Sequence, residues 1–505
     1  MKRQWTATIN RLFALVLLAA VVLPVSADID AERLSAVTGR GMELWHVPGM
    51  SVAVVTAKET VFQKGFGVTA IKDGIPVDEH TQFAIASTTK AMIVAGILML
   101  VDEEKLSLDD PISKHIPELH FHNPAVGQEL NIRDLLAHRT GLPSTDYWTF
   151  FQSMPLDEQI QRLQTVEQAA PIRTRLIYQN TMFEIAGLLI ERLSGQQWHH
   201  FLTERLWHPI GMLETYGARG LANPGQSQVT PYLYQDNKLK VAEWDFPADY
   251  ADAAGSVWSS IHDMSLWAQF LLNDGVTSNG ERLISKEGIG QMFEPHQLAS
   301  PGDFYPTIKL TQPNWRSYGL GWFQQDFQGR KIDFHTGSLS GLIALIGLDR
   351  ENQKAFIVLG NRDHAEMRHA LLWDVMDDSA TEQKRDWNQE IFDLYAQGRD
   401  KSDDEWKETQ EKRLKKTRLS LPGDAYAGTY RSAKMGDIQI AGSGRKLKMK
   451  TKRVEFEMTH WQLDTFLVEY KQWEMREFAT FNISPEASIT SVDVFGETFE
   501  RVESD

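Results

Sequence analysis

The sequence predicts a fold of the α/β class, in an α+β arrangement, with a small all-β module at the C-terminal end. Three observations carry this prediction. Residues 49–67 are rich in β-branched and alternating apolar positions, which favour strands. Residues 87–105 and 181–193 place apolar side chains at the i, i+3 and i+4 spacing of helices. From Leu421 onward, short alternating segments separated by turns dominate instead.

The part of the chain up to residue 359 contains both strand-like and helix-like patterns. Residues 51–55 form a β-branched run, and residues 60–67 alternate before a turn. A helix expected at 259–272 begins with a capping pattern, Ser260 followed by Asp263. The other elements expected are, in order, a short strand at 83–86, helices at 87–105 and 181–193, and strands at 342–348 and 354–359.

Composition excludes several classes of protein. The 505 residues suggest two to four structural units at ~100–200 residues each. With 52 Lys and Arg against 68 Asp and Glu, the formal charge of −16 argues against a nucleic-acid binder. The chain has no cysteine, so a disulfide framework, a thiolate zinc site and a cysteine nucleophile are excluded. We expect no metal and no cofactor.

The N-terminal 27 residues have the pattern of a secretory signal peptide. Lys2, Arg3 and Arg11 precede an apolar run at 12–25, and small residues follow up to Ala27. The run is shorter than the ~20 residues that a membrane span needs. An uncleaved N-terminal anchor is the alternative. We therefore expect cleavage near Ala27, a periplasmic or secreted protein, and no integral membrane span in the mature chain.

Residues 376–420 are expected to be a charged helical linker. Between residues 401 and 418, 12 of the 18 side chains are charged, which is typical of a solvated helix. A disordered tether is the alternative. Beyond it, residues 421–505 are expected to form a small β-barrel.

Four lysines in this C-terminal module fall on one strand face. They occur at every second position from Lys446 to Lys452, so period two directs them to the same side. A solvated face that guards against aggregation is the favoured interpretation. An anion-binding strip for envelope polymers is the alternative.

Ser87-Thr88-Thr89-Lys90 is the first chemical motif. A serine at the start of a helix lies near the positive end of its dipole, and a lysine three residues later shares its face. A buried amine of lowered pKa could take the serine proton. The spacing alone is weak evidence, since Ser443 and Lys446 match it in a strand-rich region where they would not share a helix face.

Two further polar motifs follow in the chain. Tyr178-Gln179-Asn180 precedes the helix expected at 181–193, where a tyrosine could act as general base and acid and an asparagine could hold a substrate amide. A capping asparagine is the simpler interpretation.

His335-Thr336-Gly337-Ser338 lies at the end of an expected strand, where backbone N–H groups could serve an oxyanion hole. A lone histidine there is more often structural.

The order of the three motifs resembles that of serine β-lactamases and penicillin-binding proteins, whose signatures are S-x-x-K, a middle polar motif and K-T-G. The tyrosine in the middle motif is similar to that of the class C β-lactamase-like branch, which includes D-aminopeptidases, D,D-carboxypeptidases and esterases. The resemblance covers residues 30–370. The surrounding segments that share it are 48–55, 83–87, 135–142, 254–259 and 318–322.

This resemblance implies a central antiparallel sheet flanked by helices, with an all-α subdomain, over residues 28–375. It implies an acyl-enzyme mechanism in which Ser87 is the nucleophile, Lys90 assists proton removal and Tyr178 is general base and acid. The substrate-binding residues implied are Asn180, His335, Thr336 and Gly337, and the backbone N–H groups of Ser87 and Ser338 would form the oxyanion hole. The module at 421–505 resembles a lipocalin-like domain found in exported relatives.

One position departs from the family pattern, because His335 replaces the lysine of K-T-G. Histidine is mostly neutral at pH 7, so it holds a substrate carboxylate less well than lysine does. If charged His335 anchored a carboxylate, affinity would fall as pH rose from 5 to 8. We expect hydrolysis of small peptide or amide substrates, and the D-aminopeptidase relatives suggest bonds beside D-residues. An ester hydrolase of the same family and a non-catalytic penicillin-binding scaffold are the alternatives, and the oligomeric state is left open.

Overall fold

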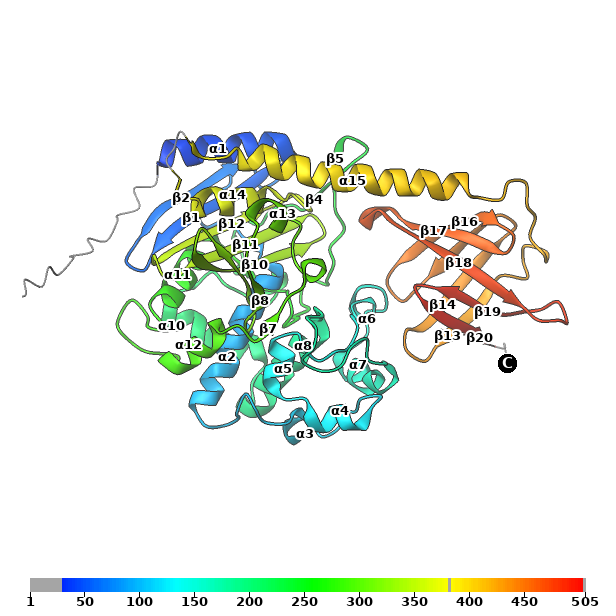
Figure 1. Ribbon diagram of the computed structural model, residues 1–505, viewed down its shortest axis with the longest axis horizontal. Helices are drawn as coiled ribbons and strands as arrows, with labels where there is room; N and C mark the ends of the chain where they lie inside the picture. Colours follow the sequence, from blue (N-terminus) through cyan, green and yellow to red (C-terminus); the bar gives the residue numbers. More distant parts are fainter. Residues whose placement is uncertain (1–29, 380–382, 503–505) are drawn as a thin grey trace, which may run out of the picture.

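The computed structural model describes residues 30–379 and 383–502, and the signal peptide predicted at residues 1–27 lies outside them. Figure 1 shows a unit in which helices surround a sheet and, beyond a long helix, a closed β-barrel. The predicted mixed fold with a small all-β C-terminal unit is confirmed.

Eight antiparallel strands form the sheet of the first unit, in the order β2-β1-β12-β11-β10-β9-β8-β7. Along β1, Val52 and Val54 pack into the core on one face, while Ala53 and Val55 pack on the other. Because both faces are covered, the strand reads as a continuous apolar run. The strands are Gly49–Thr56 (β1), Thr60–Gly67 (β2), Gln297–Leu298 (β7), Arg316–Tyr318 (β8), Phe323–Phe327 (β9), Arg330–Leu339 (β10), Leu342–Asp349 (β11) and Lys354–Gly360 (β12).

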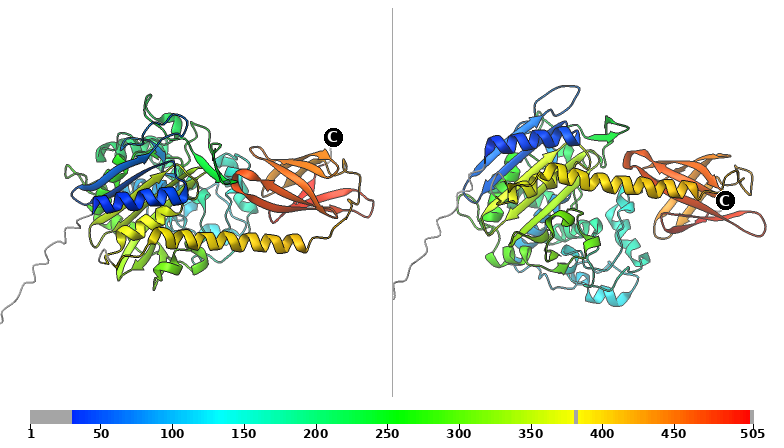
Figure 2. Two further views of the ribbon diagram at one scale, coloured as in Figure 1. Left: turned by 90° about the horizontal axis from the view of Figure 1, so that it is seen from above. Right: turned by 45° about the horizontal axis from the view of Figure 1, so that its top comes forward.

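Helices cover both faces of this sheet. Helix α11 (Ile261–Leu272) packs against β1 and β12 on one face, and it begins where the Ser260 side chain accepts a hydrogen bond from the Asp263 N–H. Helix α14 (Met367–Met376) packs on the other face against β11 and β12. Outside α14 lie α1 (Ala31–Trp45) and the start of α15 (Trp387–Glu411), as Figure 2 shows. The sheet is therefore enclosed between two helical layers.

A helical region packs beside the sheet and holds one wall of the site. Its centre is α2 (Thr89–Asp102), which is buried from Thr89 to Leu100 and contacts α8 (Asn180–Ser194). Around these two lie α3 (Ile112–His115), α4 (Pro124–Glu129), α5 (Ile132–Leu136), α6 (Tyr147–Phe150), α7 (Leu156–Arg162), α9 (Trp198–Leu202), α10 (His208–Ile210) and α12 (Lys286–Phe293). The short helix α13 (Ile308–Thr311) lies apart from them, near the start of α15. Two small sheets pair β3 (Phe83–Ala84) with β6 (Trp258–Ser259) and β4 (Tyr232–Gln235) with β5 (Lys238–Val241).

The second unit is a closed barrel of eight antiparallel strands. Leu447 and Met449 point into its core, while Lys446, Lys448 and Lys450 are exposed, as the alternation predicted. Its strands are Gly428–Ser432 (β13), Gly436–Ser443 (β14), Lys446–Lys450 (β15), Glu455–Gln462 (β16), Thr465–Tyr470 (β17), Met475–Ile483 (β18), Ile489–Val494 (β19) and Glu497–Arg501 (β20).

Acidic residues accompany the exposed lysines of β15. The Lys448 ammonium lies 2.5 Å from Glu455 and 3.7 Å from Glu457 on β16. Lys452 lies 3.6 Å from Glu158 of the first unit. These pairs agree with a solvated face and leave less free positive charge for an anion strip.

Helix α15 runs from the first unit toward the barrel, inside the segment predicted as a linker. Its first turns are part of the first unit's core, because Trp387, Asn388 and Ile391 are buried there. Its later turns are mostly exposed up to Glu411. The part of the segment that serves as a connector therefore begins later than residue 376.

The barrel also contacts the first unit directly, at α6 and the loop after it. Trp148 Nε1 donates to the Lys434 carbonyl at 2.8 Å, and Gln152 Nε2 donates to the Met435 carbonyl at 3.0 Å. The Phe151 ring packs on Phe456 and Trp473 of the barrel. Within residues 30–379 and 383–502, no helix combines the length and apolar character that crossing a bilayer requires.

Candidate active site

Ser87 lies at the turn between strand β3 and helix α2. The turn is a short 3₁₀ segment, Ala86–Thr88, that leads directly into α2. Ala86 has a φ of 46°, a left-handed conformation that costs free energy for a residue with a Cβ atom. This backbone raises the serine out of the strand and presents its hydroxyl on the face of α2 that also carries Lys90.

Lys90 makes three polar contacts at its buried amine. Its Nζ lies 3.1 Å from Ser87 Oγ, 2.7 Å from Asn180 Oδ1 and 2.7 Å from the Ala254 carbonyl oxygen. The orientation of the Asn180 amide is fixed from its other end, because its Nδ2 donates to Asp146 Oδ1 at 3.1 Å. The two amide oxygens can only accept hydrogen bonds, whereas the Ser87 hydroxyl can also donate.

Burial lowers the pKa of Lys90 to about 7, because a charged amine is poorly solvated in the interior. The carboxylates of Asp252, Asp146 and Glu184 oppose this shift. Burial in turn raises the pKa of Asp252 to about 6. Near neutral pH a substantial fraction of Lys90 is therefore an uncharged amine with a lone pair.

Tyr178 lies at the end of the loop before α8, against the same lysine. Lys90 Nζ is 4.9 Å from the centre of the Tyr178 ring, and the His138 ring packs on the tyrosine at 4.2 Å. The Tyr178 hydroxyl is buried and has no hydrogen-bond partner of good geometry. Burial raises its pKa well above the usual value, and the nearby Ser87 hydroxyl opposes that shift. Tyr178 is therefore a protonated phenol at neutral pH.

His335 is buried on β10 in a fixed tautomer. Its Nδ1 lies 2.7 Å from the Thr336 carbonyl oxygen, which can only accept, so Nδ1 carries the proton. Its Nε2 then accepts from the Tyr318 hydroxyl at 3.0 Å. Burial, with a further contribution from Lys90, lowers the pKa of His335 to about 3. His335 is neutral between pH 5 and 8, so the conditional expectation that it titrates there as a cationic anchor is wrong.

Thr336 has a partner away from the serine. Its Oγ1 lies 2.6 Å from the Tyr305 hydroxyl, and strand alternation directs it to the face of β10 opposite His335 and Gly337. The substrate-binding role that the family resemblance implies for Thr336 stays a prediction.

Gly337 allows β10 to approach the serine turn. A Cβ atom at this position would lie 2.2 Å from the Ile85 carbonyl oxygen and 2.9 Å from the Ala86 side chain. Any other residue would therefore push the strand away from the turn. The result is a close contact between the backbone before Ser87 and the end of β10.

Ser338 presents its N–H toward this contact. Leu339 and Leu342 are the hydrogen-bonded pair that closes the hairpin between β10 and β11. Hydrogen-bonded and non-hydrogen-bonded pairs alternate along an antiparallel ladder, so the next pair, Ser338 and Ile343, is non-hydrogen-bonded. Its N–H therefore points away from β11, and strand β9 pairs with β10 only as far as Phe334. This geometry suits the backbone N–H that the resemblance assigned to an oxyanion hole.

A buried ion pair stands behind the same peptide. Arg368 Nη1 donates to the Gly337 carbonyl at 2.6 Å and to Ser338 Oγ at 2.8 Å. Its other nitrogens donate to the Glu366 carboxylate at 2.9 and 3.1 Å, and His369 Nδ1 contacts the same carboxylate. Arg368 thus fixes the Gly337–Ser338 peptide from the side opposite the serine.

The structure brings Ser87, Lys90 and Asn180 into one hydrogen-bonded cluster and places Tyr178 and His335 beside it. Sequence reasoning missed the Ala254 carbonyl and the buried carboxylates around Lys90, the Tyr318 partner of His335, and Arg368. Two of these had a partial signal: Ala254 and Tyr318 lie in segments that the resemblance had singled out, without a role. Asp146, Asp252 and Arg368 could not be identified in advance, because the site residues that they contact lie far away along the chain.

A family model described as Beta-lactamase matches residues 35–381, and one described as a domain of unknown function (DUF3471) matches residues 412–503. An unguisins hydrolase of Aspergillus campestris is 27% identical over 399 residues, which are 74% of this chain and 70% of that protein. The protein flp of Staphylococcus aureus (strain N315) is 23% identical over 338 residues, 65% of this chain and 63% of that protein.

Two solved structures share the fold. The octameric penicillin-binding protein homologue from Pyrococcus abyssi superposes with a TM-score of 0.61 at 21% identity, covering 93% of this chain and 99% of that one. The D-amino acid amidase from Ochrobactrum anthropi SV3, complexed with L-phenylalanine amide, has a TM-score of 0.53 at 24% identity, covering 66% and 90%. The first of these likenesses extends over nearly all of the chain.

Proposed function

Because the chain belongs to the beta-lactamase family, we propose that it is a serine hydrolase that cleaves peptide or amide bonds through an acyl-enzyme on Ser87. One observation carries this proposal: Lys90 Nζ faces two oxygens that can only accept and one hydroxyl that can donate. A neutral amine has two N–H groups and one lone pair. The N–H groups are used by Asn180 and Ala254, so the lone pair faces the Ser87 proton.

The acylation step follows from this arrangement. Ser87 Oγ bonds to the substrate carbonyl carbon as its proton passes to Lys90 Nζ. The negative carbonyl oxygen is held by the N–H groups of Ser87 and Ser338. When the carbon–nitrogen bond breaks, the departing amine takes a proton from Tyr178, which recovers one from the Lys90 ammonium. Tyr178 suits this role because its raised pKa keeps it protonated until the amine becomes basic.

Deacylation uses the same groups in reverse. A water molecule gives a proton to the lysine–tyrosine pair as its oxygen bonds to the acyl carbon, and Ser87 Oγ recovers a proton when it leaves. No step requires a charge on His335, whose proposed part is to hold the Tyr318 hydroxyl and shape the wall of the site.

The name of one neighbour in fold, a D-amino acid amidase, supports an amide substrate, and one relative is named a hydrolase of unguisins. A panel of D- and L-aminoacyl amides against short-chain esters tests this directly. Faster turnover of the amides, measured as kcat/KM, supports a peptidase or amidase. Faster turnover of the esters alone would assign the chain to the esterases.

Covalent labelling tests the nucleophile. Intact-mass measurement after treatment with a fluorophosphonate should show one adduct, lost in Ser87→Ala. Hydrolysis of p-nitrophenyl acetate should likewise fall in Ser87→Ala and in Tyr178→Phe. Labelling that persists in Ser87→Ala contradicts the assignment, and equal hydrolysis rates in all three proteins would favour a non-catalytic scaffold.

We also propose that the protein is exported and that it has two domains, a hydrolase unit that begins at residue 28 and includes the first turns of α15, and a lipocalin-like barrel over residues 421–505. The basic and then apolar pattern of residues 1–27 supports export. N-terminal sequencing of the protein from its native host checks it, with residue 28 expected as the first residue.

A further inference from the structure

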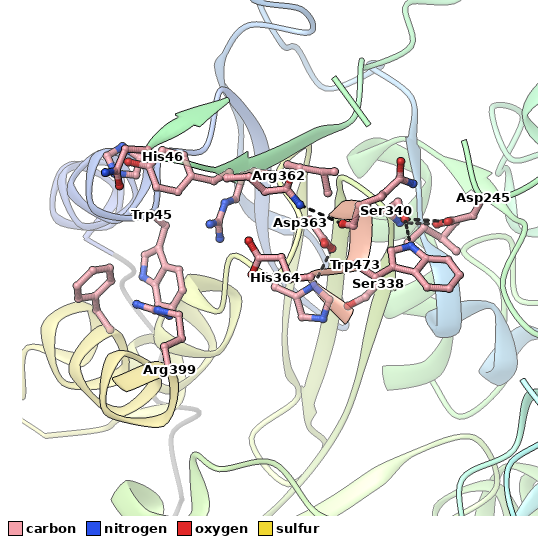
Figure 3. A pocket seen from close by; sticks show the side chains of 18 of the residues that line it. Trp45, His46, Asp245, Ser338, Ser340, Arg362, Asp363, His364, Arg399 and Trp473 are labelled. Carbon is pink, nitrogen blue, oxygen red and sulfur yellow. Dashed lines mark hydrogen bonds and ion pairs between the residues drawn. The ribbon is translucent and has the colours of Figure 1, made fainter. Parts of the chain in front are cut away.

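A large cavity lies where the barrel meets the first unit. It has a volume of about 760 Å³ and is lined by residues from α1, β4, the end of β10, the loop after β12, α15 and the barrel turn at residues 472–474. Neither Ser87 nor Lys90 lines it, but Ser338 of the proposed oxyanion hole does. Figure 3 shows Ser338, Ser340 and Trp473 at one end, Trp45, His46 and Arg399 at the other, and Arg362 between them.

Two guanidinium groups face this cavity without an anionic partner. Among the described residues, neither the Arg362 nor the Arg399 side chain makes a hydrogen bond or an ion pair, and Arg362 Nε is buried with no acceptor. The contacts they do make are with rings: Arg362 lies 5.5 Å from the Tyr234 ring and Arg399 lies 5.7 Å from the Phe392 ring. The Arg362 side chain is half-buried, so leaving its Nε without an acceptor costs free energy, whereas the Arg399 side chain is exposed.

The carboxylates of the cavity have partners or lie at its rim. Asp245 accepts from the N–H of Ser340 and from its hydroxyl, the latter at 2.8 Å. Asp363 lies 2.8 Å from His364 Nδ1 and raises the pKa of that histidine. Glu474 is exposed. Burial lowers the pKa of Arg362, Asp363 opposes that shift, and Arg399 adds to it, so the two cations lie near each other.

The sheet register fixes how far these cations lie from the proposed oxyanion hole. Ser338 pairs with Ile343, and Ile343 pairs with Gly360, so two strand steps of about 4.8 Å separate Ser338 from Gly360. Arg362 lies two residues beyond Gly360. The separation is therefore roughly 12 Å between Cα atoms, which an extended peptide spans in about three to four residues.

The barrel supplies the wall between the two ends. Trp473 Nε1 donates to Ser340 Oγ at 3.0 Å, and its ring stacks on Phe151 at 5.4 Å. With Trp45, Tyr234 and Phe392 it adds aromatic rings to the lining of the cavity.

We propose that Arg362 and Arg399 form a subsite for a carboxylate that the substrate carries about three to four residues from the scissile bond. This inference rests on the proposed function, since it names the class of substrate for the same site: short acidic peptides bound along the barrel-facing cavity. Arginine is suited to the task, because its planar fork holds a carboxylate through two parallel hydrogen bonds.

Matched substrate pairs test the subsite. On the acyl side, succinyl-(D-Ala)n-p-nitroanilide is compared with acetyl-(D-Ala)n-p-nitroanilide for n from 1 to 4. On the leaving-group side, peptides of the same lengths are compared as free acid and as carboxamide. In one of the two series we expect kcat/KM to be about ten-fold higher for the compound with the carboxylate than for its uncharged counterpart. This preference should be greatest near three residues and should decrease as the salt concentration rises.

Substitutions should remove this preference. Arg362→Gln and Arg399→Gln should each reduce this preference several-fold. Because Arg362 is half-buried, Arg362→Gln could be unstable. In that case Arg362→Lys replaces it and should retain part of the preference. Lys401→Gln is the matched control, because it lies on α15 two residues from Arg399 and hence on the opposite side of the helix. No preference in either series, or one that survives both Arg→Gln changes, would overturn the proposal.

Binding measurements separate this test from the test of hydrolysis. Calorimetry with succinyl-(D-Ala)3 amide and acetyl-(D-Ala)3 amide needs no turnover and can use Ser87→Ala. Tighter binding of the succinyl compound, lost in Arg362→Gln, supports the subsite even if the wild type hydrolyses nothing. Equal binding beside Ser87-dependent hydrolysis of p-nitrophenyl acetate would reject the subsite and leave the proposed function standing.

Discussion

Lys90 has three oxygen neighbours, and only the Ser87 hydroxyl among them has a proton to give. The amide and carbonyl oxygens of Asn180 and Ala254 hold the amine in place and direct its lone pair. The buried carboxylates nearby keep its pKa from falling further than about 7. A lysine in this environment is partly uncharged and can accept a proton at neutral pH, whereas a lysine in water is almost fully protonated there.

The first prediction concerns pH. Because Lys90 must be neutral to accept the serine proton, kcat/KM should rise with pH and level off above about 7. His335, with a pKa of about 3, should add no step between pH 5 and 8. Lys90→Arg, which stays charged, should lower kcat/KM by a factor on the order of 10² to 10⁴ at every pH. A flat wild-type profile from pH 5 to 9 contradicts this role.

The second prediction concerns Arg368, which we treat as a positioning residue. Arg368→Met leaves the buried Glu366 carboxylate without its cation, so the free energy of unfolding should fall by about 3–5 kcal/mol. Adding Glu366→Gln should recover most of that stability. If Arg368 also orients the Gly337–Ser338 peptide, kcat should remain low in the double variant while KM changes little. Denaturant unfolding and steady-state kinetics check both parts.

How far the sequence predicted the site differs from residue to residue. Ser87 and Lys90 could be found because they lie one helical turn apart, a spacing that is visible along the chain. The Asn180 and His335 motifs were placed by their order, which matches a family pattern. Asp146 and Asp252 could not be found, since only the packing of distant loops brings them to Lys90. The neutral state of His335 depends on burial, which a lone histidine does not reveal.

At the scale of elements, the contact between β10 and the turn before α2 sets the geometry of the site. It depends on the missing side chain of Gly337, whose place is taken by the Ile85 carbonyl. The strained Ala86 backbone lies directly across this contact. Helix and strand positions were predicted well here, because their periodicity is local, whereas the distance between the two elements was not visible in the sequence.

A third prediction follows for this contact. Gly337→Ala should force β10 away from the turn and displace the Ser338 N–H, with a loss of 10²-fold or more in kcat, as expected for removing an oxyanion donor. Gly398→Ala on exposed α15 is the control, because a Cβ there meets nothing within 4 Å. That control should keep full activity and stabilise the helix by roughly 0.5–1 kcal/mol. Unchanged kcat in Gly337→Ala would show that the contact is not needed.

At the scale of the whole molecule, the barrel is a wall of the cavity as well as a separate unit. Its turn at residues 472–474 reaches the end of β10, and its strands pack on α6. The alternating strands of the barrel were predicted as a group over residues 421–505. Its docking was not predicted, because the contacting residues are single aromatic and polar side chains in loops.

The fourth prediction tests this docking. Trp473→Ala removes the hydrogen bond to Ser340 and the stack on Phe151, so the barrel should release α6 more often. Hydrogen exchange of residues 147–152 should speed up several-fold, while exchange in the central strand β11 stays the same. Leu463→Ala, at an exposed barrel position, is the control and should change neither. Unchanged exchange at 147–152 in Trp473→Ala would mean that other contacts hold the barrel.

Helix α15 has one more consequence for how the cavity behaves. Its 25 residues span about 37 Å and begin inside the first unit, so the barrel is tied to that unit by a stiff strut even when its contacts with α6 break. The two surfaces then meet again as parts of one molecule, at an effective concentration set by the strut and not by the amount of protein in solution. If the barrel and the first unit separate, their rejoining is a unimolecular step whose rate dilution does not change.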